Sequence, residues 1–339
     1  MINRVYRLVS PKNIIVDFEE INFSSQDIII KPTKLSICAA DQRYYLGKRN
    51  ESVMKKKLPM ALIHEAIGEV IFDPLHEFNV GDKVVMIPNT PIEKNDSISE
   101  NYLESSKFRS SGFDGFMQDY VQMERDRIIK FENINEEIAS FLELISVCIH
   151  AIDRFEKKSN PKNCTIGVWG DGNLGFIMSL ILKKVYVDCE IIVFGKNIEK
   201  LNFFSFVDKV FQIDNIPENI KIDHAFELVG GKNSKYAIEQ IIDIINPQGT
   251  ISLLGVSEEY IEVNTRLILE KGLMLIGNSR STREDFIKSI DLLEKDEYIR
   301  ENLRKLISNV LDVSSIDDII KAFEYDLTST FKTIINWNI

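Results

Sequence analysis

The chain lacks the features that mark secreted, membrane-spanning or nucleic-acid-binding proteins. It has only four cysteines in 339 residues and no CxxC pair, which argues against a disulfide-stapled domain and favours a reducing compartment. No apolar run approaches the roughly 20 residues of a membrane span, and the segment from Met1 to Lys12 has no signal-like apolar stretch. A formal net charge of -11 argues against a nucleic-acid surface. We therefore expect a cytoplasmic protein that binds neither membranes nor nucleic acids.

The length and the apolar content indicate two domains. A chain of 339 residues with 44% hydrophobic residues can bury two cores of about 150 residues each. The first part contains short β-branched runs broken by Gly, Pro and Asn, which predicts a strand-rich domain. The expected strands are Asn13–Asp17, Asp27–Ser36, Ile67–Phe72 and Lys83–Ile87. The polar segment Pro88–Ser111 interrupts this pattern and is expected to be a long surface excursion with a short helix.

Strands and helices alternate in the second part. Apolar residues at helical spacing after Glu136 predict a buried linking helix. The units that follow are the strands Thr165–Trp169, Glu190–Phe194, Lys209–Ile213, His224–Leu228 and Thr250–Gly255 and the helices Leu174–Tyr186, Ile198–Phe204 and Ser234–Ile244. This rhythm predicts an α/β domain with a doubly wound parallel sheet. The tail carries two more helices, Asp285–Glu294 and Ile316–Tyr325, and a strand, Lys332–Trp337, and is expected to return to the first domain.

A glycine-rich turn joins the first of these strands to its helix. Gly170, Gly172 and Gly175 form a G-x-G-x-x-G pattern that also contains Asn173 and Leu174. Glycines at these positions permit a tight turn, the approach of a pyrophosphate and close helix packing, while the helix N-terminus offers free N–H groups to the anion. A purely structural turn is the alternative, but the flanking strand and helix favour a dinucleotide site.

The end of the second strand bears on the choice of dinucleotide. NAD sites place an acidic residue here, about 20 residues beyond the last glycine, to bind the ribose 2′-hydroxyl. This chain has Gly195, followed by Lys196 and, one helical turn later, Lys200. Lysines attract a 2′-phosphate that a carboxylate would repel, so we expect NADPH to be preferred. The alternative is that both lysines are ordinary solvated helix residues.

Four residues in the strand-rich part are suited to one metal ion. Cys38, His64, Glu65 and Glu143 offer a thiolate, an imidazole and carboxylates, a set that can hold Zn²⁺ and leave one position open. Each signal is weak alone, because a single cysteine is usually core filler and a single histidine is usually a satisfied polar residue. The order and the context of these residues carry the hypothesis.

That context resembles a known family. The stretches PMALIHEAIGEV, GDKVV and ELISVCIHA are similar to those of the zinc-dependent medium-chain dehydrogenase/reductase family, especially its sorbitol dehydrogenase-like branch, and the resemblance covers nearly the whole chain. It implies a GroES-like catalytic domain, residues 1–150 and 286–339, and a Rossmann dinucleotide-binding domain, residues 151–285. It also implies that Cys38, His64 and Glu143 hold a catalytic zinc and that Glu65 can enter its coordination shell. Asp41 matches an acid that orients the histidine ligand.

Two departures from the family pattern limit what it implies. Many relatives hold a second, structural zinc with four cysteines, but Pro88–Ser111 contains none, so we expect one zinc per chain. Alcohol dehydrogenases relay the substrate proton through a Ser or Thr where this chain has Ala40. Water on the metal, Glu65 or another group must therefore deliver the proton. His150 is a distant candidate that we interpret as structural.

A narrower resemblance concerns the substrate. The stretches SICAADQRYYLGKR, MIPNTP and WGDGNLG look like those of the ribulose-5-phosphate reductases that supply ribitol 5-phosphate, and from it CDP-ribitol, for wall teichoic acid or capsule synthesis. It implies NADPH-dependent, zinc-assisted reduction of D-ribulose 5-phosphate to D-ribitol 5-phosphate, a sugar phosphate as the small-molecule partner, a homodimer, and association with a ribitol-phosphate cytidylyltransferase.

A basic set gives independent support for a phosphorylated substrate. Arg43, Lys48, Arg49 and Arg109 are close in sequence to the expected site residues of an otherwise acidic chain, and they could bind the substrate phosphate. The alternative for each is a solvated surface charge. Two rival functions remain: an NAD(P)-dependent polyol dehydrogenase acting on an unphosphorylated sugar alcohol, and a catalytically silent relative that senses nucleotides.

Overall fold

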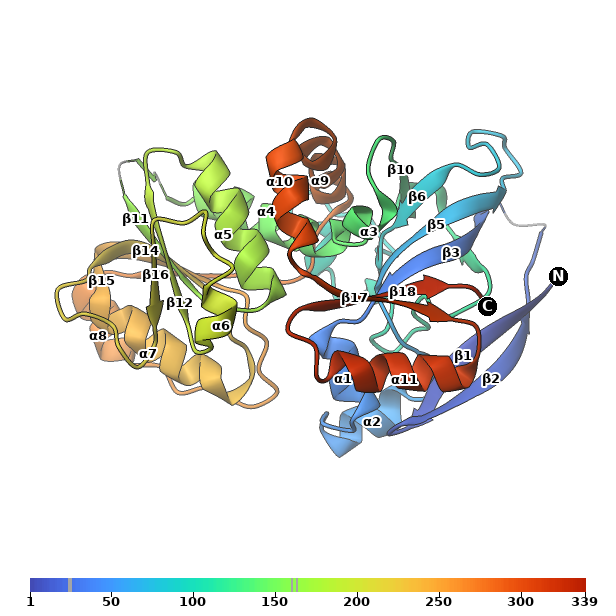
Figure 1. Ribbon diagram of the computed structural model, residues 1–339, viewed down its shortest axis with the longest axis horizontal. Coiled ribbons are helices and arrows are strands. Elements are labelled where there is room, and N and C mark those ends of the chain that lie inside the picture. Colours follow the sequence, from blue (N-terminus) through green and yellow to red (C-terminus); the bar gives the residue numbers. More distant parts are fainter. Residues whose placement is uncertain (24–25, 160, 163) are drawn as a thin grey trace. The chain divides into compact units, whose positions relative to one another are not determined.

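The computed structural model describes residues 1–23, 26–159, 161–162 and 164–339, which form two compact units (Figure 1). One unit comprises Met1–Ser146 and Ser281–Ile339, and the other comprises Val147–Arg280. The boundaries expected from the sequence lie at residues 150 and 286, a few residues later in the chain. No helix in the described part of the chain is long and apolar enough to cross a membrane.

The first unit is rich in β-strands, as predicted. Its described strands form a three-stranded sheet in the order β2-β1-β4, a seven-stranded sheet in the order β10-β6-β5-β3-β18-β17 with β9 beside β3, and the pair β7-β8. The strands are β1 (Ile2–Ser10), β2 (Asn13–Glu20), β3 (Ile28–Ser36), β4 (Met60–Ala61), β5 (Glu65–Phe72), β6 (Lys83–Met86), β7 (Asn89–Thr90), β8 (Lys107–Phe108), β9 (Val121–Met123), β10 (Ile128–Lys130), β17 (Ile307–Val313) and β18 (Lys332–Trp337). The C-terminal tail enters this unit, as expected, because β18 pairs with β3.

The same unit contains the helices expected after Glu136 and in the C-terminal tail, together with short helices that the sequence pattern did not indicate. Its helices are α1 (Ala39–Tyr45), α2 (Glu51–Lys57), α3 (Glu136–Ala139), the start of α4 (Leu142–Glu156), α9 (Arg283–Lys295), α10 (Glu297–Arg304) and α11 (Ile316–Asp326), with the 3₁₀ turns η1 (Glu100–Tyr102) and η2 (Arg125–Arg127). The α1 and α2 helices are only two turns long, too short for a clear apolar periodicity. Figure 1 shows α1 beside α11, where the rings of Tyr45 and Phe323 stack with centroids 4.7 Å apart.

The polar segment Pro88–Ser111 is tied to the rest of its unit. The short helix expected there is the 3₁₀ turn η1, which lies between β7 and β8. The buried Arg127 donates to the carbonyl of Asn89 at 3.2 Å and pairs with Glu100 at 3.1 Å. A buried guanidinium therefore ties this segment to the rest of its unit.

The second unit is the predicted doubly wound parallel sheet. Its described strands follow the order β13-β12-β11-β14-β15-β16, and all neighbouring pairs are parallel. They are β11 (Thr165–Trp169), β12 (Glu190–Gly195), β13 (Lys209–Gln212), β14 (Ile222–Glu227), β15 (Ile245–Leu253) and β16 (Met274–Gly277), accompanied by the rest of α4 and by α5 (Asn173–Val185), α6 (Ile198–Leu201), η3 (Gly231–Asn233), α7 (Ser234–Ile244) and α8 (Thr265–Lys271).

This strand order creates a binding crevice. The chain adds β12 and β13 on one side of β11 and then crosses to add β14 on the other side. Ligands of open α/β sheets bind at such a reversal, outside the carboxyl ends of the strands. The core beneath it is apolar and includes Trp169 at the end of β11, which stacks on Phe194 with centroids 4.0 Å apart.

Candidate functional site

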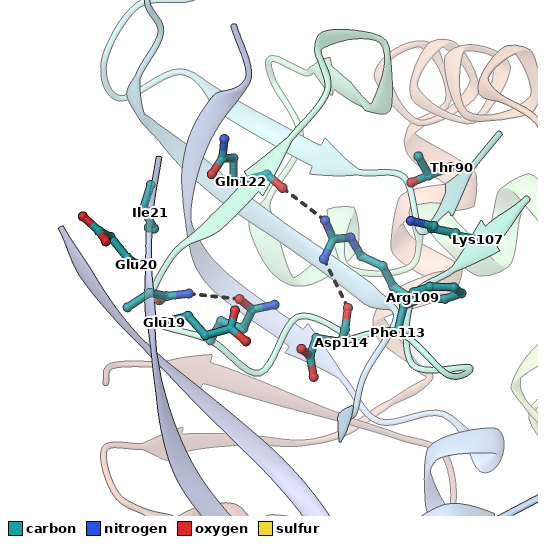
Figure 2. Close-up of a pocket in the computed structure, with 11 residues that line it drawn as sticks. Glu19, Glu20, Ile21, Thr90, Lys107, Arg109, Phe113, Asp114 and Gln122 are labelled. Carbon is teal, nitrogen blue, oxygen red and sulfur yellow. Dashed lines mark hydrogen bonds between the residues drawn. The ribbon is translucent and has the colours of Figure 1, made fainter. Parts of the chain in front are cut away.

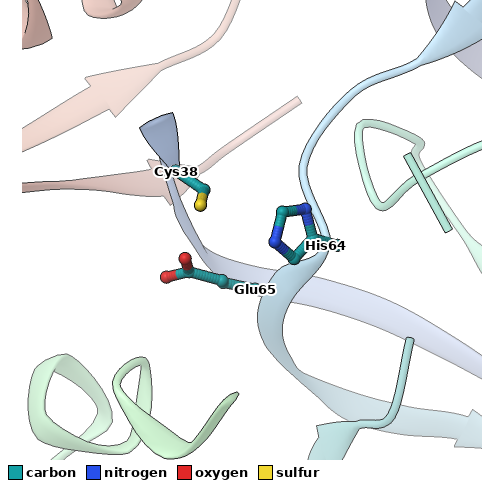
Figure 3. Close-up of side chains that lie close together, drawn as sticks. All are labelled: Cys38, His64 and Glu65. Carbon is teal, nitrogen blue, oxygen red and sulfur yellow. The ribbon is translucent and has the colours of Figure 1, made fainter. Parts of the chain in front are cut away.

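Three of the predicted metal ligands come together in the first unit (Figure 3). Cys38 follows β3 and His64 precedes β5, and these strands are antiparallel with Ser36 opposite Glu65. This register places residues 26 positions apart in sequence at one end of the strand pair. The ligand atoms of Cys38, His64 and Glu65 all lie within 4.8 Å of one another, with His64 and Glu65 buried. A tetrahedral Zn²⁺ requires ligand atoms roughly 3.5 Å apart, so this set is compact enough to share one ion.

Asp41 organises the residues around this group. Its carboxylate is fully buried in the first turn of α1 and accepts hydrogen bonds from the Ser110 hydroxyl at 2.6 Å, the Ile63 N–H at 3.0 Å and the Cys38 N–H at 3.1 Å. Its Oδ1 lies 3.6 Å from Nδ1 of His64. The second imidazole nitrogen, Nε2, remains for a metal ion. Asp41 therefore lies beside the imidazole of His64.

The electrostatics of the group follow from burial and from these contacts. Burial alone would lower the pKa of His64, but the Asp41 carboxylate and the Cys38 sulfur outweigh it and hold that pKa well above its ordinary value. Burial would raise the pKa of Asp41, but the imidazole and the Ser110 hydroxyl outweigh it and lower that pKa. Burial, followed by the nearby Glu65, raises the pKa of the Cys38 thiol. A divalent cation favours the thiolate instead, so metal binding at this site would release protons.

Backbone strain marks the residue before the histidine. Ile63 has a φ of 68°, in the left-handed region that β-branched residues rarely adopt. Such a conformation costs about 1–3 kcal/mol and persists only where the surroundings fix it. Here the Ile63 N–H donates to Asp41, and its carbonyl accepts from the Phe116 N–H at 2.8 Å. These bonds direct the His64 side chain toward Cys38.

A buried lysine that the sequence analysis did not select completes the surroundings of Glu65. Lys332, on β18, donates to Glu65 Oε2 at 2.7 Å and to the Ile37 carbonyl at 3.1 Å. The side chains are 2% and 0% exposed, so this is a fully buried ion pair. The other oxygen of the carboxylate, Oε1, is buried without a hydrogen-bond partner. No local pattern reveals the pair, because its members are 267 residues apart.

Glu143 is not a member of this group, whose ligand atoms lie within 4.8 Å of one another. It is buried in the first turn of α4, where burial raises its pKa to about 7 although the nearby His64 opposes the shift. The carboxyl is therefore within electrostatic reach of His64 and Glu65.

Of the four basic residues expected to bind a phosphate, Arg109 and Arg49 line two different cavities in the described part of the chain. Arg109 lines a cavity of about 300 Å³ in which its terminal nitrogens donate to the carbonyls of Asp114 and Gln122 (Figure 2). Burial lowers the pKa of its guanidinium to about 10. Arg49 lines a different cavity, of about 330 Å³, and stacks over the Tyr44 ring at 4.6 Å. Arg43 is on α1, and the Lys48 N–H donates to its carbonyl at 2.8 Å.

The second unit contains the expected nucleotide pocket. A cavity of about 590 Å³ is lined by residues that follow β11, β12, β13 and β14, among them Gly170, Gly172, Gly195 and Lys196. The last glycine of the motif is required by close packing, because a Cβ on Gly175 would lie 2.0 Å from the Gly170 carbonyl oxygen. Gly172 caps α5, which begins with Asn173, Leu174 and Gly175. Lys200, on α6, is not among the described residues that line this pocket.

Two carboxylates that the sequence analysis did not select hold the loops of this pocket. Asp171 accepts hydrogen bonds from the N–H groups of Lys196 and Asn197, both at 2.7 Å. Glu227, at the end of β14 and 1% exposed, accepts from the N–H groups of Val229 at 2.9 Å, Gly230 at 3.3 Å and Gly255 at 3.2 Å. Asp171 could have been selected from the sequence, because it occupies the variable position between the first two glycines of the motif.

Comparisons with known proteins show the family to which the chain belongs. Residues 24–133 match the alcohol dehydrogenase GroES-like domain. The chain is 53% identical to the ribulose-5-phosphate reductase of Bacillus spizizenii and 53% identical to ribulose-5-phosphate reductase 2 of Staphylococcus aureus, in each case over 100% of both chains. The crystal structure of S. aureus TarJ in complex with NADPH is similar with a TM-score of 0.89, at 47% identity, over 100% of both chains.

Proposed function

Because this chain belongs to the zinc-dependent medium-chain dehydrogenase/reductase family, among its ribulose-5-phosphate reductases, we propose that it reduces D-ribulose 5-phosphate to D-ribitol 5-phosphate with NADPH. The observation that carries the proposal is the full-length identity of 53% to two such reductases. The product would supply CDP-ribitol for teichoic acid or capsule synthesis. Both the compact Cys-His-Glu group and the nucleotide pocket support this reaction.

The first unit is chemically suited to one catalytic Zn²⁺. Cys38, His64 and Glu143 would hold the ion, with Glu65 able to enter its coordination shell. A cysteine sulfur, an imidazole and carboxylates are zinc donors, and the unpartnered Oε1 of Glu65 is the kind of buried polar atom that a cation satisfies. A bound Zn²⁺ would polarise the C2 carbonyl of the substrate as a Lewis acid, and NADPH would supply the hydride.

The protein's own residues prepare this chemistry. Asp41 lies 3.6 Å from His64 Nδ1 and would favour that face of the imidazole, which leaves Nε2 for the ion. Lys332 restrains Glu65 on one oxygen and leaves the other free for the ion. Ala40 has no hydroxyl, so the proton of the new alcohol must come through another group, for which Glu65 and water are the candidates.

The nucleotide pocket supports a 2′-phosphorylated cofactor. Helix α5 presents its first N–H groups beside Gly170 and Gly172, where a pyrophosphate would bind. Gly195 provides no carboxylate against the ribose. Lys196 lines the pocket and would attract the 2′-phosphate, and Lys200 follows it on α6, outside the pocket lining.

We also propose a cytoplasmic homodimer that associates with a ribitol-phosphate cytidylyltransferase. For the dimer, support comes from β16, the edge strand of the parallel sheet. Met274 and Leu275 on this strand are 42% and 37% exposed, and Leu269 on the neighbouring α8 is 80% exposed. An apolar open edge of this kind favours pairing with another chain.

The decisive assay follows NADPH oxidation with ribulose 5-phosphate and, separately, with free ribulose. We expect the phosphate ester to react far faster, because a dianion approaching a chain of net charge -11 needs local cations. Single alanine variants of Arg43, Lys48, Arg49 and Arg109 then identify the phosphate-binding residues by a rise in KM for the ester only. Equal kcat/KM for ester and free sugar would replace this proposal with a general polyol dehydrogenase.

A further inference from the structure

The nucleotide pocket contains a carboxylate that a dinucleotide-binding turn does not require. Asp171 directly follows the first glycine of the motif, and its Oδ2 accepts from the N–H groups of Lys196 and Asn197 at 2.7 Å each. Those two amides begin the segment after β12, the strand end at which the adenosine ribose of a bound dinucleotide lies. One side chain thus ties the pyrophosphate turn to the segment that faces the ribose.

Asp171 also explains the glycine at the end of β12. A Cβ on Gly195 would lie 2.7 Å from the Asp171 Cβ and 2.9 Å from its Oδ2, closer than real Cβ atoms approach other atoms. The φ of Gly195 is outside the left-handed region, so its conformation does not require glycine. The space that a side chain at residue 195 would need is therefore filled by Asp171 and by Leu201, whose Cδ2 would lie 2.8 Å from that Cβ.

This arrangement bears directly on the choice of cofactor. In NAD-preferring sites an acid at the position of Gly195 binds the ribose 2′-hydroxyl. Here such an acid is sterically incompatible with Asp171. The Asp171 carboxylate is itself directed at two backbone amides, which stabilise its charge, and the exposed Lys196 lines the pocket.

We infer that Asp171 is a positioning residue for the ribose 2′-phosphate of the cofactor. Asp171 fixes the backbone of Lys196 and Asn197, and it occupies space that a larger side chain at residue 195 would need. Selection of a 2′-phosphorylated dinucleotide therefore depends on Asp171, although its carboxylate does not bind the phosphate. The inference rests on the proposed use of NADPH and adds the residue that establishes it.

The first test measures equilibrium binding of NADPH and NADH to the full-length chain by nicotinamide fluorescence. In Asp171→Ala we expect the Kd for NADPH to rise about tenfold and the Kd for NADH to change less than threefold. Asp171→Asn should stay within threefold of the wild type, because an amide oxygen can still accept both N–H groups. Asp188→Ala, which removes the same charge from an exposed turn of the same unit, serves as the matched control and should bind both nucleotides normally.

Steady-state kinetics then separate positioning from general damage. The KM for NADPH of Asp171→Ala should rise with little change in kcat at saturation. An unchanged Kd for NADPH, or an equal loss for NADH, would overturn the inference. So would an Asn variant as weak as the Ala variant, because the side chain would then act through its charge rather than through its geometry.

A double-mutant cycle tests the steric part without relying on one variant. Gly195→Ala should weaken NADPH binding about tenfold in the wild type but at most about threefold in Asp171→Gly, where the Asp171 Cβ is absent and only the flexible end of the Leu201 side chain still lies within 3 Å. Additive losses would contradict the inference. If the wild type binds NADPH no more tightly than NADH, the proposed cofactor fails together with the inference. If it prefers NADPH but the cycle is additive, only the inference fails.

Discussion

Replacing Lys332 with Met should destabilise the first unit by about 3–5 kcal/mol, because it leaves Glu65 as a buried carboxylate without a counter-ion. The ammonium lies 2.7 Å from Glu65 Oε2, a separation at which two unit charges attract by roughly 6 kcal/mol at an effective dielectric of about 20. Methionine keeps most of the apolar stem and lacks only the terminal Nζ, so the exchange leaves only a small void. The loss of the charge partner therefore dominates the effect, which is a large fraction of the stability of a typical domain.

The two tryptophans make the assay specific to each unit. Trp337 is buried on β18 in the first unit, and Trp169 is buried on β11 in the second. In a Trp169→Phe background, urea unfolding followed by Trp337 fluorescence reports on the unit that contains Lys332. In the matched Trp337→Phe background, the fluorescence of Trp169 should show that Lys332→Met leaves the stability of the second unit unchanged.

Two further comparisons decide whether the ion pair is the cause. Adding Glu65→Gln to Lys332→Met should restore most of the stability, because a neutral amide is much less costly to bury than a carboxylate. Zinc should also reduce the loss, since a cation beside Glu65 replaces the missing charge. If Lys332→Met loses less than about 1 kcal/mol in the metal-free protein, the pair does not have the role that we assign to it.

Two other predictions address the metal and the pH dependence. Metal analysis should find one zinc per chain, and a chelator should abolish turnover but leave NADPH binding intact; two tightly bound zinc ions would contradict the ligand set. Asp73→Asn should cost about 2 kcal/mol at pH 7, because Arg125 first and then the N–H groups of Phe78, Leu75 and Glu77 lower the pKa of the Asp73 carboxyl. A lowered folded-state pKa stabilises the fold above the unfolded value of about 3.9, so the difference from the wild type should shrink as acid unfolding is followed below pH 4. A difference that is constant down to pH 2 would refute this linkage.

The features predicted correctly from sequence are those encoded by local spacing. The G-x-G-x-x-G pattern lies on consecutive residues, and the structure places it between β11 and α5 as expected. The β-branched runs likewise predicted strands, because alternating or continuous apolar segments can be recognised within a few residues. By contrast, α1 and α2 are two-turn helices whose signals are caps, such as Asn50 accepting from the Ser52 N–H, rather than periodicity.

The residues and the partners that sequence analysis did not predict depend on contacts between segments far apart in the chain or on how a loop folds. Lys332 meets Glu65 only because β18 joins the same sheet as β3 and β5. Arg109 was a candidate because of its charge, yet its terminal nitrogens are directed at backbone carbonyls, a use that depends on how the loop folds. Residue type indicates what a side chain can do, but only tertiary structure determines which partner it has.

Asp171 shows how one tertiary contact changes the meaning of a sequence signal. From sequence alone, Gly195 indicates a missing acid and hence a tolerance for the 2′-phosphate. In the structure, the Asp171 carboxylate from the glycine-rich turn lies beside Gly195. An acidic side chain is therefore present in this region, and it accepts hydrogen bonds from the Lys196 and Asn197 amides. The net charge near the ribose is therefore not what the residue at position 195 suggests. We infer that the cofactor choice of this chain depends on where the Asp171 side chain is directed as well as on the glycine at position 195.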